Sequence, residues 1–129
     1  MQFKQIKETC IYFRDLEQAR DFYHKKLGLE IIGHIEGKHI FFRAGTSVLL
    51  CFNPDDSRNK KSPPPHFAEG KYHFAFEVDQ AQYQNQKKIL LDKGITITDE
   101  VVWKNGLKSS YFEDPVGNVL EIVPEGVWE

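Results

Sequence analysis

The chain carries one order of elements twice: a strand, a helix and then three strands. In each half an alternating apolar segment precedes an amphipathic helix, and a glycine ends that helix, at Gly28 and again at Gly94. Short strand-like segments separated by turn residues then follow. This repeat predicts an α+β fold built from two βαβββ modules.

The halves can be divided into elements by their apolar periodicity. Asp15 and Asp79 are expected to cap the two helices, because each precedes an amphipathic stripe. The strands expected in the first half are Glu8–Phe13, Leu29–Ile35, His39–Ala44 and Ser47–Phe52. Those expected in the second half are Lys71–Val78, Ile95–Trp103, Lys108–Glu113 and Val119–Val123.

Between the halves lies a segment with three consecutive prolines and no apolar periodicity, which predicts a linker or lid over about residues 55–70. Module 1 then covers about residues 1–54 and module 2 about residues 71–126. Each half alone is near the lower size limit for independent folding. We therefore expect one domain over residues 1–129, with the modules paired either within one chain or across a dimer.

Charge and composition exclude several classes of partner. The formal net charge is -2 and the pI is near 6.2, so the chain has no basic footprint for nucleic acid or an anionic membrane. No apolar run has the roughly 20 residues of a spanning helix, and we expect a cytoplasmic protein. The two cysteines, Cys10 and Cys51, lie in strand-like segments, where reduced thiols are the expected outcome.

Glu121 is the residue that most needs a chemical explanation. It interrupts an apolar strand whose side chains predict burial on both faces. An unpaired carboxylate in such a place costs several kcal/mol or takes up a proton. Glu121 is therefore expected to have a partner: a metal, a Lys or Arg side chain, or a wet cavity.

Aligning the two halves of the sequence with each other identifies three further residues at positions related to that of Glu121. The overlay places Glu8 on His73 and Cys51 on Glu121. Strand alternation puts Glu8 and His73 on the face turned away from the helix of each module. That open face of the sheet is where a site is expected.

Three segments resemble the vicinal oxygen chelate superfamily, which includes glyoxalase I, fosfomycin- and bleomycin-resistance proteins and extradiol dioxygenases. They are IYFRDLEQARDFYHKKLGLEI, HFAFEVD and YFEDPVGNVLEIV, and the resemblance covers nearly the whole chain. It implies that the modules form a curved eight-stranded mixed sheet, a cup with helices on its convex side. It also implies a divalent metal, Zn, Ni, Mn or Fe, bound by Glu8, His73 and Glu121.

The resemblance also implies roles around the metal. Glu121 and Glu8 are the expected catalytic carboxylates, and Cys51 stands where glyoxalase I has a further carboxylate. Cys51 is either a ligand or substrate contact, or simply a small buried side chain. The remaining residues expected to contact substrate are Ser109, Tyr111, His39, Arg43 and the linker residue His66.

The activity expected from these residues is that of a metal-dependent lyase or isomerase of the glyoxalase type. Its substrate is expected to be a small oxygenated molecule or the thiol adduct of one. The alternative is a non-catalytic protein that binds a drug or metabolite, like bleomycin-resistance proteins. A fosfomycin transferase or an extradiol dioxygenase fits the ligand set less well, and the resemblance favours a homodimer.

Overall fold

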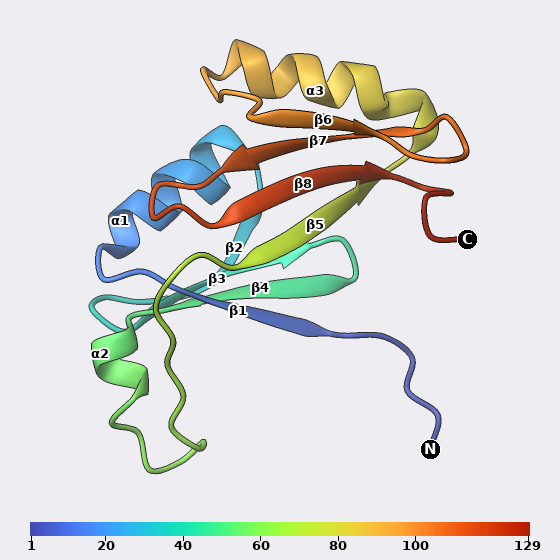
Figure 1. The fold of residues 1–129 in the computed structure, drawn as a ribbon. Coiled ribbons are helices and arrows are strands. Elements are labelled where there is room, and N and C mark those ends of the chain that lie inside the picture. The colour runs from blue at the N-terminus through green and yellow to red at the C-terminus, as the bar shows by residue number, and fades with distance from the viewer. The chain divides into compact units, whose positions relative to one another are not determined.

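The computed structural model describes all 129 residues, and they form two compact units, Met1–Glu69 and Gly70–Glu129 (Figure 1). Each unit contains one four-stranded mixed sheet with a helix on one face. The expected α+β class with two βαβββ modules is therefore confirmed. No helix is long and apolar enough to cross a membrane.

The first unit has the strand order β1-β4-β3-β2. Strand β1 is parallel to β4, and the other neighbours are antiparallel. The strands are β1 (Glu8–Tyr12), β2 (Glu30–Ile35), β3 (His39–Ala44) and β4 (Ser47–Phe52), close to the ranges expected from the sequence.

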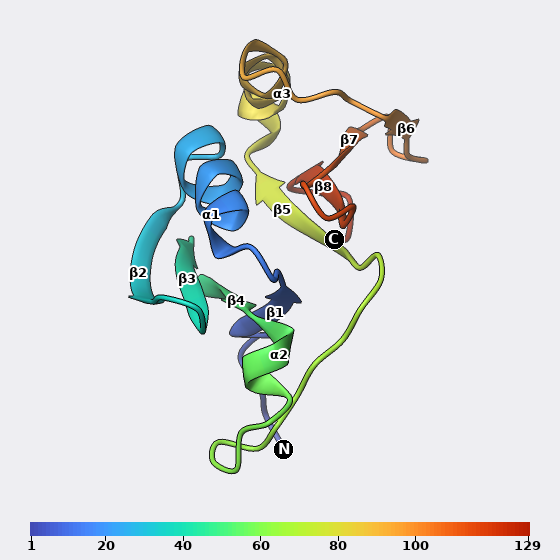
Figure 2. The same cartoon turned by 90° about the vertical axis from the view of Figure 1, so that its left-hand side faces the viewer.

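One helical segment covers one face of this sheet (Figure 2). It begins as α1 (Leu16–Ala19) and continues without a break as a π-helical stretch, η1 (Arg20–Lys26). The Asp15 carboxylate accepts a hydrogen bond from the Glu17 amide at 3.1 Å, so the expected cap is confirmed. The side chains buried between helix and sheet include Leu16, Ala19, Phe22, Tyr23, Ile11, Phe13, Ile40 and Phe42.

The second unit repeats this arrangement with the order β5-β8-β7-β6. Strand β5 is parallel to β8, and α3 packs on the face that carries the buried Leu120 and Ile122. The elements are β5 (His73–Val78), the 3-10 turn η2 (Gln80–Gln82), α3 (Tyr83–Asp92), β6 (Asp99–Val102), β7 (Lys108–Glu113) and β8 (Val119–Pro124).

Two expectations for this unit are wrong in detail. The strand expected over Ile95–Trp103 covers only Asp99–Val102, because the Ile95 amide bonds to the Leu90 carbonyl and closes the helix instead. Asp79 precedes the helical segment but makes no capping hydrogen bond through its side chain.

The segment expected to be an irregular linker is attached to the first unit. It contains a short helix, α2 (Pro54–Ser57), capped by the Asn53 side chain. Arg14 pairs with Asp55 at 3.1 Å and with Glu69 at 2.5 Å, at the two ends of the segment. Arg14 thus contacts both ends of residues 54–69, which belong to the first unit.

Candidate functional site

His73 and Glu121 lie together on the open face of the second sheet. His73 begins β5, and Glu121 in β8 is paired with Ala75, two residues further along β5 on the same face. The Nε2 atom of His73 is 3.3 Å from Oε2 of Glu121. Glu121 is 6% exposed, so its predicted burial is confirmed, and the side chain beside it is a histidine rather than a Lys or Arg.

The second ring nitrogen of His73 decides what its Nε2 can do. Nδ1 lies 2.9 Å from the Val119 carbonyl oxygen, which can only accept a hydrogen bond. Nδ1 therefore carries a hydrogen, and in the neutral ring Nε2 turns a lone pair toward the Glu121 carboxylate. Two acceptors facing each other need a proton or a metal cation between them.

The separation of these two donors fits a metal ion. Two ligand atoms each about 2.1 Å from a tetrahedral ion lie roughly 3.4 Å apart, close to the 3.3 Å found. A backbone carbonyl that fixes the tautomer of a ligating histidine is the usual support for such a ligand. Within either unit, no group of three or more His, Cys, Asp or Glu side chains is arranged so that it could hold a metal ion.

The hairpin between β7 and β8 positions both side chains. Asp114 accepts hydrogen bonds from the amides of Val116 and Asn118 at 3.1 and 2.9 Å, and from the Asn118 side chain at 2.8 Å. Asn118 in turn accepts from the Tyr72 amide at 3.0 Å, next to His73. These contacts fix the start of β5 against the start of β8, although Asp114 and Asn118 were not among the residues predicted for the site.

Tyr111 and Ser109 lie on the same open face, as the sequence predicted. Tyr111 pairs with Glu121 across β7 and β8, and its ring centroid is 5.9 Å from that of His73. Burial raises the pKa of Tyr111, a hydrogen bond with Ser109 opposes this, and the nearby Glu121 carboxylate raises it further. Ser109 is fully buried.

Trp103 also lies at this site. Its Nε1 donates a hydrogen bond to Ser109 Oγ at 3.0 Å, so the indole lies on the face that carries Tyr111 and Glu121. The alternation of side chains along β6 indicates this position for Trp103. Val101 faces the same side of the sheet as its partner Ser109, and Trp103 follows Val101 two residues later.

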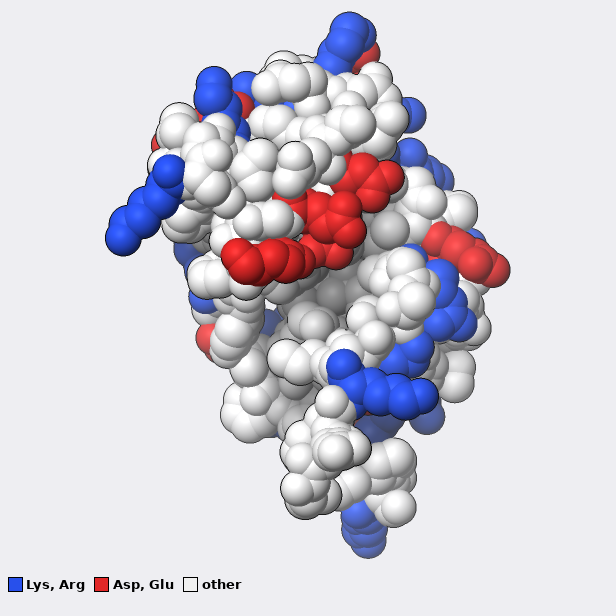
Figure 3. All heavy atoms as spheres, turned by 90° about the vertical axis from the view of Figure 1, so that its right-hand side faces the viewer, with Lys and Arg blue, Asp and Glu red and all other residues white.

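The open face of the second sheet carries an excess of acidic groups. Besides Glu121 it bears Glu77, Asp99 and Glu113, and only Glu113 has a basic partner, Lys71 at 3.2 Å. The four strands place no Lys or Arg on this face. Acidic side chains also stand close together in the space-filling view (Figure 3). A bound cation would offset this charge.

The first unit places Glu8 as expected but corrects the overlay for Cys51. Glu8 is exposed and begins β1 on the open face, paired with Val48 as His73 is paired with Val119. Leu50 lies two residues after Val48 in β4, and Glu121 lies two residues after Val119 in β8, so Leu50 is the counterpart of Glu121. Cys51 pairs with Ile11 instead, on the helix-covered face, and is fully buried. The overlay of Cys51 on Glu121 is wrong by one residue, which turns the side chain to the opposite face.

The other expected substrate contacts of this unit lie along the open face. Arg43 is exposed, and the His39 ring stacks on Phe41 with centroids 4.0 Å apart. Burial lowers the pKa of His39, and the charge on Lys60 lowers it further. His66 Nδ1 lies 2.8 Å from the Tyr12 hydroxyl, so this linker residue contacts β1.

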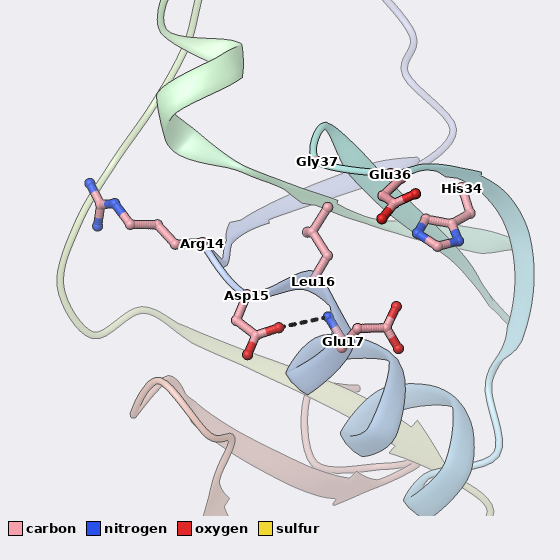
Figure 4. Close-up of a pocket in the computed structure, with 7 residues that line it drawn as sticks. All are labelled: Arg14, Asp15, Leu16, Glu17, His34, Glu36 and Gly37. Carbon is pink, nitrogen blue, oxygen red and sulfur yellow. Dashed lines mark hydrogen bonds between the residues drawn. The ribbon is translucent and has the colours of Figure 1, made fainter.

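A cavity of the first unit lies elsewhere. It has a volume of about 490 Å³ and lies between the start of α1 and the β2–β3 turn (Figure 4). Its lining residues are Arg14, Asp15, Leu16, Glu17, His34, Glu36 and Gly37. None of the residues expected to bind metal or substrate is among them.

Known proteins similar to this chain share its architecture along its length. Residues 5–122 match the family model of the Glyoxalase/Bleomycin resistance protein/Dioxygenase superfamily. A crystal structure of lactoylglutathione lyase from Agrobacterium tumefaciens is 33% identical, with a TM-score of 0.92 and coverage of 98% of both chains.

Two further proteins match the chain at lower identity. The uncharacterized protein YurT of Bacillus subtilis is 29% identical over 126 residues, 92% of this chain and 97% of YurT. The virulence protein STM3117 of Salmonella typhimurium is 20% identical, with a TM-score of 0.75, and the match covers 96% of this chain and 98% of that one. The chain belongs to the Glyoxalase/Bleomycin resistance protein/Dioxygenase superfamily.

Proposed function

We propose that this protein is a divalent-metal-dependent lyase or isomerase of the glyoxalase type, acting on a small oxygenated molecule or its thiol adduct. The observation that carries the proposal is the pair of His73 and Glu121. The ring tautomer set by Val119 turns an Nε2 lone pair toward a buried carboxylate at 3.3 Å. The similarity to a lactoylglutathione lyase supports the same class of reaction.

Three residues would hold the metal: His73, Glu121 and Glu8. Glu8 is included because it occupies in β1 the register position that His73 occupies in β5. It would come from the same chain or from a second copy in a homodimer. Zn, Ni, Mn and Fe all accept such nitrogen and oxygen donors.

The chemistry follows from what these residues do around a bound substrate. A divalent metal held there would supply Lewis-acid polarisation of a substrate carbonyl. Glu121 and Glu8 would be the carboxylates that accept and return a proton. The Tyr111 hydroxyl carries a proton at neutral pH, as tyrosine hydroxyls ordinarily do, and could donate a hydrogen bond to a substrate oxygen.

Metal binding to the purified protein tests the proposal. Equilibrium dialysis against Zn²⁺, Ni²⁺ and Mn²⁺ should give one tight site per chain, and Glu121→Gln and His73→Gln should each weaken it at least tenfold. Glu77→Gln is the matched control, since Glu77 is an exposed carboxylate on the same face of β5. Equal affinities of wild type and Glu121→Gln would overturn the proposal.

The second candidate is a non-catalytic binding protein. It is favoured by one observation: within either unit only two metal-ligating side chains meet on the open face. A binding protein would retain its ligand unchanged. Incubating the metal-loaded protein with a methylglyoxal thiol adduct, and following substrate and product by NMR, distinguishes turnover from binding.

A further inference from the structure

The only two tryptophans of the chain lie against each other at one end of the second unit. The ring centroids of Trp103 and Trp128 are 6.2 Å apart and their planes meet at 50°. Trp103 is half-buried, while Trp128 is 83% exposed. An exposed indole that adjoins a second aromatic ring offers apolar area that a ligand can cover.

The C-terminal segment is fixed so that Trp128 stays at this place. Gln80 donates to the Glu125 carbonyl at 2.9 Å, and Asn105 donates to the Gly126 carbonyl at 3.0 Å. Gly126 has a φ of +98°, a conformation that favours glycine, and a Cβ atom there would lie 2.6 Å from the end of the Gln80 side chain. Chain termini are usually loose unless they are tied down, and this one is held by two other segments.

A continuous line of side chains joins the tryptophans to the proposed metal ligands. Trp103 donates to Ser109 Oγ at 3.0 Å, and Tyr111 follows Ser109 on the same face of β7. Tyr111 then pairs with Glu121 across the sheet. Two residues along a strand span about 6.7 Å and neighbouring strands lie about 4.8 Å apart. The tryptophan pair is thus on the order of 10 Å from Glu121.

From this arrangement we infer that Trp103 and Trp128 bind an apolar tail of the substrate whose oxygens are held at His73 and Glu121. The inference rests on the proposed function and adds the substrate class: an elongated molecule with an oxygenated head and an alkyl or aryl group at the other end. Trp103 and Trp128 are then specificity-determining residues, and Ser109 positions Trp103 through the hydrogen bond to its indole.

A series of straight-chain hydroxamates tests the inference, from acetohydroxamate to decanohydroxamate, because each presents two adjacent oxygens and a tail of set length. Their affinities for the zinc-loaded protein are measured by calorimetry. Once the tail spans the distance to the indoles, each further methylene should tighten binding about threefold to fourfold. The fluorescence of the two tryptophans should change only with those longer members.

Variants decide which side chains cause the dependence on length. In Trp128→Ala the ratio of decanohydroxamate to acetohydroxamate affinity should fall at least tenfold. In the control Leu91→Ala, which removes an exposed apolar side chain of α3, that ratio should stay at its wild-type value. A ratio unchanged in Trp128→Ala overturns the inference. The inference is also overturned if Trp128→Ala changes only the oligomeric state, measured by sedimentation, since the indoles would then face a second copy of the chain.

The same experiment separates this inference from the proposed function. Failure of acetohydroxamate to bind the zinc-loaded protein counts against the metal site alone. Titration of the metal-free protein with 1-octanol, read by tryptophan fluorescence, tests the aromatic pair without a metal-binding head. Saturable quenching in wild type that Trp128→Ala loses supports the inference, and its absence from wild type overturns it.

Discussion

Leu50 in β4 occupies the register position that Glu121 occupies in β8. Glu8 begins β1 and pairs with Val48, and Leu50 lies two residues further along β4. In the same way His73 begins β5 and pairs with Val119, and Glu121 lies two residues further along β8. The two modules share their topology, but the buried carboxylate is present in only one of them. The polar part of the proposed site is therefore concentrated on the second sheet, with Glu8 as the contribution of the first.

This register gives Cys51 a packing role and predicts a stability effect. Cys51→Ala removes a fully buried thiol between helix and sheet and should lower the free energy of unfolding by about 1–2 kcal/mol. Metal affinity should not change, because the side chain points away from the open face. Urea denaturation and dialysis check both parts, with the exposed Cys10→Ala as control. A loss of metal binding in Cys51→Ala would contradict the register argument.

The reactivity of Cys10 should depend on Glu8. Burial and the Glu8 carboxylate both raise the pKa of the Cys10 thiol, so less thiolate is present at a given pH. Glu8→Gln removes one of these causes, and the pH midpoint of the reaction with a disulfide reagent should move to lower pH. The reaction rate is measured against pH in the Cys51→Ala background, where Cys10 is the one remaining thiol. Burial is the larger cause, so the midpoint should remain above that of a small free thiol.

The hairpin network should control both stability and the metal site. Asn118→Ala removes the hydrogen bonds that the Asn118 side chain makes with the Tyr72 amide and with Asp114, at a cost of about 2–4 kcal/mol in unfolding free energy. Metal affinity should fall as well, because Tyr72 adjoins His73. Asn85→Ala, on the exposed face of α3, should change stability by less than about 0.5 kcal/mol. Thermal unfolding with and without Zn²⁺ measures both effects.

The linker should behave as part of the first unit. Residues 58–61 contain three trypsin sites, and contacts of Arg14 and His66 hold the segment on either side of them. Tyr12→Phe removes the hydroxyl that lies 2.8 Å from His66 Nδ1 and should speed tryptic cleavage there severalfold. Arg14→Gln should have less effect, since exposed ion pairs contribute little. Cleavage rates equal to wild type in Tyr12→Phe would show that the hydrogen bond does not hold the segment.

Much of the fold follows from the sequence because its local signals agree with one another. Gly28 and Gly94 end the two helices with φ of +77° in both cases, a conformation that favours glycine. Alternation along β3 and β4 predicted both strands to the residue. Glu121 was singled out as a buried carboxylate that requires a partner, and the overlay of the two halves and the family resemblance added His73, which lies 3.3 Å from it.

What the sequence could not supply depends on register and on distant segments. Counting residues between the two halves misplaced Cys51 by one position, and a one-residue error exchanges the two faces of a strand. The pairing of Trp103 with Trp128 joins a turn to the C-terminal segment, and no local pattern encodes that contact. The π-helical stretch after Ala19 also has no signal in apolar periodicity, because the buried residues Leu16, Ala19, Phe22 and Tyr23 have the spacing of an ordinary α-helical stripe.

A buried network behind the site predicts a loss of stability at alkaline pH. The Tyr83 hydroxyl lies 2.5 Å from Ser110 Oγ and donates to Glu100 at 2.9 Å, and burial is the main cause that raises the pKa of Tyr83 to about 12. An unfolded tyrosine titrates near 10. The folded state thus keeps a proton that the unfolded state loses.

The stabilisation from Tyr83 is complete below about pH 10 and declines as the pH rises toward 12. Over that interval wild type should lose about 1–3 kcal/mol more than Tyr83→Phe, whose ring cannot titrate. Urea unfolding between pH 8 and pH 11.5 measures the difference between the two proteins, and the other tyrosines cancel in it. Parallel stability curves for wild type and Tyr83→Phe would show that the hydroxyl titrates alike in both states.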